Sequence, residues 1–118
     1  MVNAAIVILA GIESGTDLGR LVNGLETAKE FSEHPDDEVE LLFDGAGTRW
    51  IPELEDPTHD FHDLYTAVKD EATACPFCAT AFGVADEVET ACVRTPDEYD
   101  GHRSIRTLVA EGYEVLTF

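Results

Sequence analysis

Basic residues are scarce in this sequence. The 118-residue chain has 7 lysines and arginines against 25 aspartates and glutamates, a formal net charge of −18 at pH 7. A surface this acidic repels phosphate backbones and anionic lipids, so we expect neither nucleic acid nor a membrane as a partner. The carboxylates are spread along the whole chain, which is typical of a protein that works in concentrated salt, where charges are screened over a few ångströms. We therefore expect a halophilic protein whose stability rises with salt.

Long apolar runs are also absent. No run approaches the length needed to span a bilayer. The opening segment MVNAAIVILAGIESG has no basic residue before its apolar stretch, so we interpret it as a buried strand rather than a signal peptide. These features predict a cytoplasmic protein. In a reducing compartment, its three cysteines are expected to be free thiols, metal ligands or redox groups rather than a structural disulfide.

Apolar segments with strand character alternate with helical patterns along the chain. The expected strands are Ala4–Leu9, Val39–Phe43, Glu71–Cys75, Val88–Val93 and Tyr113–Phe118. Expected helices begin near Thr16, Thr58, Pro76 and Ile105; the first runs to about Glu33 and the last stops at Gly112. Gly45–Pro57 is expected to be irregular. This alternation predicts one α/β domain over residues 1–118, with a five-stranded, mainly parallel sheet between layers of helices.

In parallel sheets, binding and catalytic residues lie in the loops that follow the carboxyl ends of the strands. Three loops meet this rule: Gly11–Thr16, Asp44–Arg49 and the segment that begins at Cys75. The first, GIESGT, lacks the glycine–lysine pair of a phosphate-binding loop, so we expect no nucleotide, flavin or other cofactor. In the second, Arg49 and the following Trp50 either border a site or serve as a surface arginine and a core tryptophan.

The third loop opens the segment ACPFCATAFG, which carries Cys75 and Cys78. A cysteine at a helix N-terminus meets unpaired backbone N–H groups, which favour the reactive thiolate. Cys78 lies three residues on and shares the same helical face, so the pair could close a disulfide, resolve a persulfide or share a metal. Both could instead pack as small hydrophobic residues. We expect Cys92, in an apolar strand, to be a packing residue.

Two further functions are compatible with the doublet. The first is dithiol oxidoreduction of the thioredoxin or glutaredoxin type. Those proteins carry the doublet after an early strand, whereas here two strand–helix units precede it, so the placement argues against this class. The second function is zinc binding, because His59 and His62 precede the doublet and would complete a tetrahedral set of two histidines and two cysteines. Histidines at the start of a helix are more often solvent-exposed or helix-capping residues than metal ligands, so we expect no metal.

The order of these segments resembles the DsrE/DsrF-like family, in its haloarchaeal type. The resemblance rests on AAIVILAGIESGTDLGRLVNGLETAKE, VELLFDGAG, ACPFCATAFG and EGYEVLTF, which together span nearly all of the chain. It implies a flavodoxin-like three-layer fold in which a cysteine at the end of the third strand opens a helix of small residues that ends in glycine. Cys75 and Gly83 match those two positions.

The resemblance also implies a function in sulfur relay. Cys75 matches the position that carries a persulfide, and Cys78 matches a second cysteine found in some archaeal-type members. The implied partners are other sulfur-relay proteins or small sulfane-sulfur donors, and the implied assembly is a homotrimer or hexamer with Trp50 or Phe82 at its interface. The alternative is a non-enzymatic, homo-oligomeric interaction module whose cysteines are structural or bind zinc.

Overall fold

The computed structural model describes all residues from 1 to 118. One sheet in the order β3-β2-β1-β4 forms its centre, and every pair of neighbouring strands is parallel. The strands are β1 (Asn3–Ile8), β2 (Glu38–Phe43), β3 (Ala72–Ala74) and β4 (Glu114–Thr117). The helices are α1 (Gly15–Ser32), η1 (Gly45–Arg49), α2 (Trp50–Glu55), α3 (His62–Val68), η2 (Lys69–Glu71), α4 (Pro76–Ala81), α5 (Ala85–Thr90) and α6 (Ile105–Ala110).

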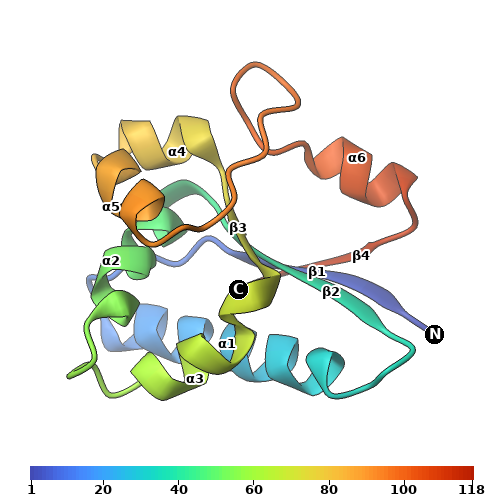
Figure 1. Cartoon of the computed structure of the whole chain (residues 1–118), viewed down its shortest axis with the longest axis horizontal. Helices are drawn as coiled ribbons and strands as arrows, with labels where there is room; N and C mark the ends of the chain where they lie inside the picture. Colours follow the sequence, from blue (N-terminus) through green and yellow to red (C-terminus); the bar gives the residue numbers. More distant parts are fainter.

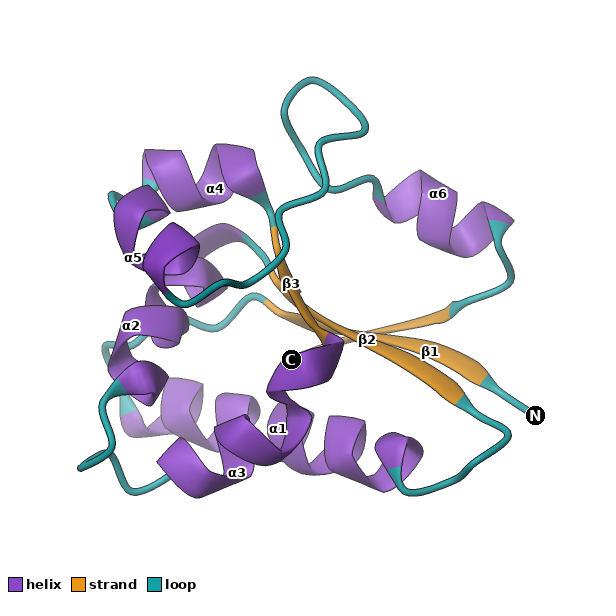
Figure 2. Cartoon of the chain, in the orientation of Figure 1, coloured by secondary structure: helices purple, strands orange, loops and turns teal.

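Helices cover both faces of the sheet. Helices α1 and α3 lie along one face and α6 lies on the other, while α4 and α5 gather near the ends of the strands (Figure 1). The strands form the middle layer between these helices (Figure 2). A single α/β domain with a parallel sheet was predicted from the alternation of segments, and this coarse architecture is confirmed.

The central strand β1 pairs with β2 on one side and β4 on the other, and its residues from Ala4 to Ile8 are almost inaccessible to solvent. Burial on both faces explains why β1 is continuously apolar rather than alternating. The first helix also forms as the sequence predicts. The side chain of Ser14 accepts a hydrogen bond from the Asp17 N–H and so caps α1, whose Leu21, Leu25 and Ala28 are buried against the sheet.

The two faces of the sheet differ in their cores. The face under α1 and α3 belongs to a cluster of 21 buried residues that includes Ile6, Leu41 and Phe43. The opposite face has a cluster of four, in which Leu108 of α6 packs on Ala5, Val7 and Leu42. Beyond this small cluster the second face is polar, because Thr73 and Glu40 bond one another there. Most of the hydrophobic stabilisation therefore comes from the first face.

The prediction of a fourth strand at Val88–Val93, within a sheet of five, is wrong. Residues Ala85–Thr90 form α5, and beyond it only Arg94 pairs with the sheet, through a single parallel bridge to Thr73. The buried positions Val84, Val88 and Ala91 are spaced four and three residues apart, which is the period of a helix face rather than of a strand.

The strand order also departs from the flavodoxin-like expectation. In the flavodoxin order β1 lies between β2 and β3. Here β2 lies between β1 and β3, and β4 occupies the free side of β1. The sheet is therefore parallel and covered on both faces, as expected, but wound in a different order.

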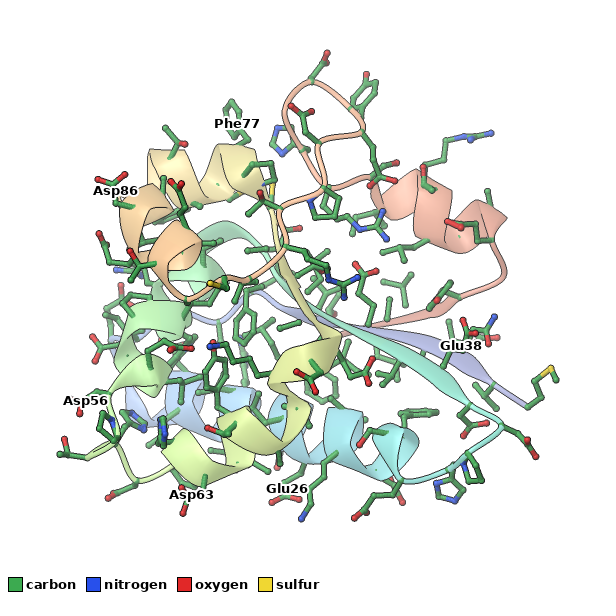
Figure 3. The ribbon with its side chains drawn as sticks, viewed as in Figure 1. Glu26, Glu38, Asp56, Asp63, Phe77 and Asp86 are labelled. Carbon is green, nitrogen blue, oxygen red and sulfur yellow. The ribbon has the colours of Figure 1, made fainter.

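No helix of the chain is long and apolar enough to cross a bilayer. Acidic side chains such as Glu26, Asp56, Asp63 and Asp86 point outward around the molecule (Figure 3). The aromatic ring of Phe77 also points outward, from α4 (Figure 3). Phe77 is 53% exposed, which is unusual for a large apolar side chain and draws attention to the region of α4.

Candidate functional site

The candidate site lies at the carboxyl edge of the sheet, where β2 and β3 end side by side. Asp44 directly follows β2 and Cys75 directly follows β3. Cys75 stands at the N-cap of α4, Pro76 occupies the first turn, and Gly83 follows the helix with a φ of +75°. The predicted position of the doublet, at a strand end and opening a helix closed by glycine, is confirmed.

Cys75 is held rigidly by its backbone. Its N–H donates to the Phe43 carbonyl at 3.1 Å, and its own carbonyl accepts from the Ala79 N–H at 2.9 Å. The first bond continues the β2–β3 ladder and the second belongs to the first turn of α4. The residue is only 1% exposed, so its thiol is enclosed rather than presented to solvent.

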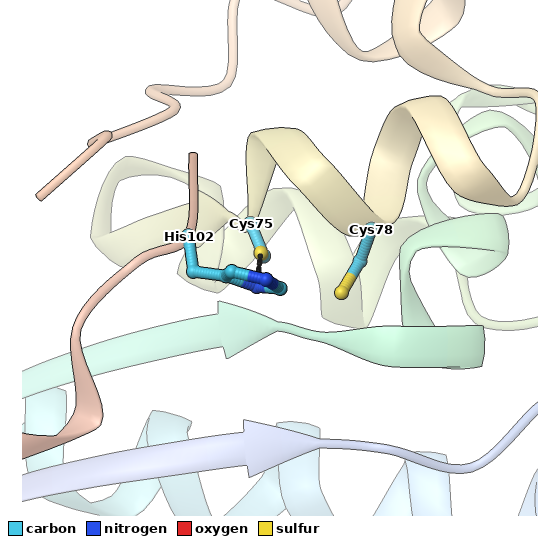
Figure 4. A group of neighbouring side chains, drawn as sticks. All are labelled: Cys75, Cys78 and His102. Atoms are coloured by element: carbon cyan, nitrogen blue, oxygen red, sulfur yellow. Dashed lines mark hydrogen bonds between the residues drawn. The ribbon is translucent and has the colours of Figure 1, made fainter. Parts of the chain in front are cut away.

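The side chain that meets the Cys75 thiol is His102, which comes from the loop before α6. Its Nδ1 lies 3.4 Å from the Cys75 Sγ (Figure 4). The His102 ring also stacks against Phe77, with ring centroids 4.3 Å apart and planes 30° from parallel. This stacking, together with a hydrogen bond from the Phe77 N–H to the Gly101 carbonyl at 3.0 Å, fixes the histidine over the thiol.

His102 was not identified as a site residue from the sequence. It lies 27 positions after Cys75, so no local spacing connects the two. A signal was nevertheless present. The polar loop Thr95–Gly101, which leads directly to His102, follows the segment expected to form the fourth strand. That strand does not form, but Arg94 just beyond it pairs in parallel with Thr73, so the loop still lies at the carboxyl edge, where the rule places such loops.

The loop that carries His102 is tied to the sheet by a partly buried ion-pair network. The Arg103 guanidinium, 8% exposed, donates from Nε and Nη2 to the two carboxylate oxygens of Glu40, both at 2.8 Å. It also pairs with Glu98, and Thr73 Oγ1 donates to Glu40 at 2.8 Å. These bonds raise the pKa of Arg103 further above its usual range, chiefly through Glu40. The bidentate geometry anchors the residue next to His102 with good precision.

Cys78 lies one turn into α4 and is half-buried beside Cys75. Its thiol donates a hydrogen bond to Asp44 Oδ1 at 3.3 Å. Burial raises the pKa of Cys78 to about 12; its contacts with Cys75 and with the Asp44 carboxylate act in the same direction, and the Gly45 N–H opposes them. The thiolate form of Cys78 is therefore disfavoured. The two thiols of the doublet also differ in their partners, because Cys75 contacts an imidazole nitrogen and Cys78 contacts a carboxylate.

The other loops at this edge lie close by but serve structural roles. Arg49 pairs with Glu13, a bond that lowers the pKa of that carboxyl, and its guanidinium lies 5.4 Å from the centre of the Phe82 ring. Trp50 is buried and donates from its indole to the Ala10 carbonyl at 3.0 Å. Of the two residues expected at an interface, Trp50 is thus a core residue and only Phe82 is exposed.

The structure does not bring His59 or His62 to the cysteines. His62 Nδ1 contacts the Leu54 carbonyl at 2.7 Å, and His59 accepts from the Phe61 N–H while its ring meets Trp50 edge-on. Both histidines therefore hold the corner between α2 and α3. The set of two histidines and two cysteines considered from the sequence does not form.

The third cysteine also differs from its prediction. Cys92 is exposed and stands in the turn after α5 with a φ of 60°, rather than packing within a strand. Its thiol makes one polar contact, a long one to the Thr90 carbonyl at 3.8 Å. Cys92 is thus an accessible thiol without a neighbouring base, which makes it a useful reference for Cys75.

The site brings together a buried thiol, a histidine and a second thiol that stays protonated. When the proton of the imidazole is on Nε2, Nδ1 can take the proton of Cys75 and leave a thiolate beside an imidazolium. A groove of about 360 Å³ runs next to the site, lined by Pro76, Phe77, Thr80, Ala81, Asp97 and Gly101. Neither cysteine lines this groove.

Comparison with known proteins gives a distant relative and no family. The chain is 26% identical over 80 residues to the uncharacterized protein MJ0733 of Methanocaldococcus jannaschii. The match covers 68% of this chain and 65% of the relative, so it spans less than two thirds of the relative's length. No protein-family model and no solved structure matches the chain. The comparisons therefore assign no activity.

Proposed function

We propose that this protein is a sulfur carrier in which Cys75 holds a sulfane sulfur as a persulfide. The observation that carries the proposal is the 3.4 Å contact between the Cys75 Sγ and His102 Nδ1 at the carboxyl edge of the sheet. A thiolate is the nucleophile in reactions with sulfane sulfur, and an adjacent imidazole is the common means of producing one. The resemblance to the DsrE/DsrF-like family supports the same residue.

The loading step transfers one neutral sulfur atom. His102 takes the Cys75 proton, and the thiolate attacks the outer sulfur of a donor persulfide, R–S–SH. The donor S–S bond breaks as the new Cys75 S–S bond forms, and the departing thiolate R–S⁻ takes the proton back from His102. The products are the Cys75 persulfide and R–SH, so atoms, charge and electrons balance.

Cys78 determines how long the persulfide lasts. Its thiolate can attack the inner sulfur of the persulfide, which forms a Cys75–Cys78 disulfide and releases hydrosulfide. A cellular dithiol must then reduce that disulfide. Because the raised pKa keeps Cys78 protonated, this discharge is slow, and the sulfur remains available for an acceptor thiol. Cys78 thus protects the site from long exposure to sulfane sulfur without competing with transfer.

Access to Cys75 requires movement of the loop that covers it. The residue is 1% exposed, and its thiol meets His102, whose ring stacks on Phe77. Exposed apolar side chains follow the ends of β1 and β3 around the site, namely Leu9, Ile12, Phe77 and Phe82. In this proposal they are covered when donor, acceptor or further copies of the chain dock, and the copies assemble as a cytoplasmic homotrimer or hexamer.

Sulfur loading can be measured by intact-protein mass spectrometry after incubation with polysulfide. The reduced protein is first treated with a chelator, and the exposed thiol is removed with Cys92→Ser in every sample. The Cys92→Ser chain is expected to gain the mass of one sulfur atom, and the Cys75→Ser/Cys92→Ser chain is expected to gain none. An equal gain in both chains would refute Cys75 as the acceptor.

A further inference from the structure

Three strong ligand atoms for a soft metal ion converge at this site. The Sγ atoms of Cys75 and Cys78 and a ring nitrogen of His102 all lie within 4.8 Å of one another. Figure 4 shows the three side chains directed toward a common space, two from the start of α4 and one from the loop before α6. A separate chain segment thus completes a cluster that the doublet only begins.

The separations are close to those of an assembled metal site. With Zn–S bonds near 2.3 Å and Zn–N bonds near 2.0 Å, tetrahedral geometry places neighbouring ligand atoms about 3.6 to 3.8 Å apart. The Cys75–His102 contact is 3.4 Å and no pair exceeds 4.8 Å. Bringing the three atoms to these separations requires shifts of about 1 Å, which is within the range of small side-chain adjustments.

The ligand chemistry selects the ion. Two thiolates and an imidazole prefer Zn²⁺ over the oxygen-seeking Mg²⁺ and Ca²⁺. Asp44 Oδ1 lies 3.3 Å from the Cys78 Sγ, outside the group of three but beside it. Its carboxylate can fill the fourth position or orient a water molecule there. The acidic surface elsewhere offers mainly carboxylates and no second cluster of this kind, so it would hold such an ion weakly.

We propose that Cys75, Cys78 and His102 form a site for one Zn²⁺ ion, with the Asp44 carboxylate at the fourth position. This inference goes beyond sulfur carriage and does not depend on it. Zinc binding displaces the thiol protons, including that of Cys78, and engages both sulfurs and the imidazole. A zinc-loaded chain is therefore closed to sulfane sulfur until the ion is removed. The histidine of the site is His102, whereas His59 and His62 remain in the α2–α3 corner.

Cobalt titration separates this site from adventitious ion binding by carboxylates. Co²⁺ replaces zinc, and its thiolate ligands give charge-transfer absorption that carboxylate-bound cobalt lacks. The titration is carried out on the reduced full-length chain in molar KCl, which suppresses weak ion binding to the acidic surface. Cys92→Ser and His62→Asn serve as matched controls for Cys75→Ser, Cys78→Ser and His102→Asn, and circular dichroism verifies that each variant is folded.

We expect one Co²⁺ per chain with thiolate charge transfer, displaced by Zn²⁺ and unchanged in both controls. Each cysteine variant should lose sulfur ligation. His102→Asn should weaken affinity by more than the roughly 10- to 100-fold that follows loss of an outer-sphere partner, and Asp44→Asn should weaken it by less. Absence of charge-transfer absorption, an unchanged affinity in His102→Asn, or loss of binding in His62→Asn would overturn the proposal. Because sulfur loading is measured with chelator present, either proposal can fail without the other.

Discussion

The two histidine-bearing regions of this molecule show opposite relations between sequence and space. His59 and His62 precede the cysteine doublet by less than 20 residues, yet they lie in the α2–α3 corner and contact the backbone, aromatic rings and the Thr66 hydroxyl there. His102 follows Cys75 by 27 residues and contacts its thiol. The pairing of Cys75 with its histidine is therefore set by strand order rather than by sequence distance.

The two regions also differ in what holds them. The α2–α3 corner is fixed by short-range bonds, such as those from the backbone and side chain of Thr58 to the Asp56 carboxylate. The loop that carries His102 is fixed by Arg103 and Glu40, which are 63 positions apart in the chain. A long-range ion pair thus places His102, while local turn chemistry places the other two histidines.

The largest expected effect comes from removing the long-range tie. Arg103→Met leaves the Glu40 carboxylate partly buried with only Thr73 as a partner, so we expect the free energy of unfolding to fall by about 3 kcal/mol. The loop would also lose its anchor, and the reactivity of Cys75 should change with it. Urea denaturation in high salt, followed by circular dichroism, measures the stability change.

Arg49→Met is the matched control for this substitution. Arg49 also pairs with a glutamate, but Glu13 is 59% exposed, and exposed pairs contribute at most about 1 kcal/mol. If the two variants lost equal stability, the buried tie would not be what holds the His102 loop.

The next effect separates the two histidine regions chemically. His102→Asn removes the base beside Cys75, so alkylation of Cys75 by iodoacetamide at neutral pH should slow by about ten-fold or more. His62→Asn should leave that rate unchanged and cost about 1 kcal/mol of stability through its bond to the Leu54 carbonyl. Peptide mass spectrometry in a Cys92→Ser background assigns the label. A rate that falls in His62→Asn but not in His102→Asn would reverse the assignment of roles.

The smallest effect concerns the loop that covers Cys75. Gly101 has a φ of +83° and a Cβ there would meet nothing closer than Phe77 at 3.8 Å, so Gly101→Ala adds backbone strain of about 1 kcal/mol without a clash. Looser closure should speed hydrogen exchange of the Phe77 N–H, which bonds to the Gly101 carbonyl, by about five-fold.

Gly112→Ala is the control for Gly101→Ala, because Gly112 has a similar φ of +87° and open space around it. It should cost similar stability yet leave the exchange of the Phe77 N–H at the wild-type rate. Equal acceleration in both variants would mean that Phe77 exchanges only by global unfolding, and that the loop does not open on its own.

Much of this fold could be predicted from local signals in the sequence. The apolar run of β1, the Ser14 cap of α1 and the strand end before Cys75 each depend on a few adjacent residues. The error at Val88–Val93 arose because a short apolar segment fits a strand or a helix, and the helical spacing that begins at Val84 lies partly outside it.

The site was predictable only in part, because some of its residues are placed by local features and others by contacts between distant parts of the chain. Cys75 and Cys78 could be placed because strand ends and helix starts are local features. His102, Asp44 and the Arg103–Glu40 pair join the site through the order of strands in the sheet, and that order depends on which hydrophobic faces pack together. Cys92 was misplaced because its environment depended on the strand that does not form.

In the proposed function, the environment of Cys75, and not its accessibility, makes it the sulfur acceptor. The most direct measurement is the initial rate of sulfur uptake from polysulfide in three chains that each retain one thiol. We expect the chain with only Cys75 to load fastest, to hold one added sulfur and to slow when His102→Asn is added. Loading at an equal or higher rate in the chain with only the exposed Cys92 would contradict the account.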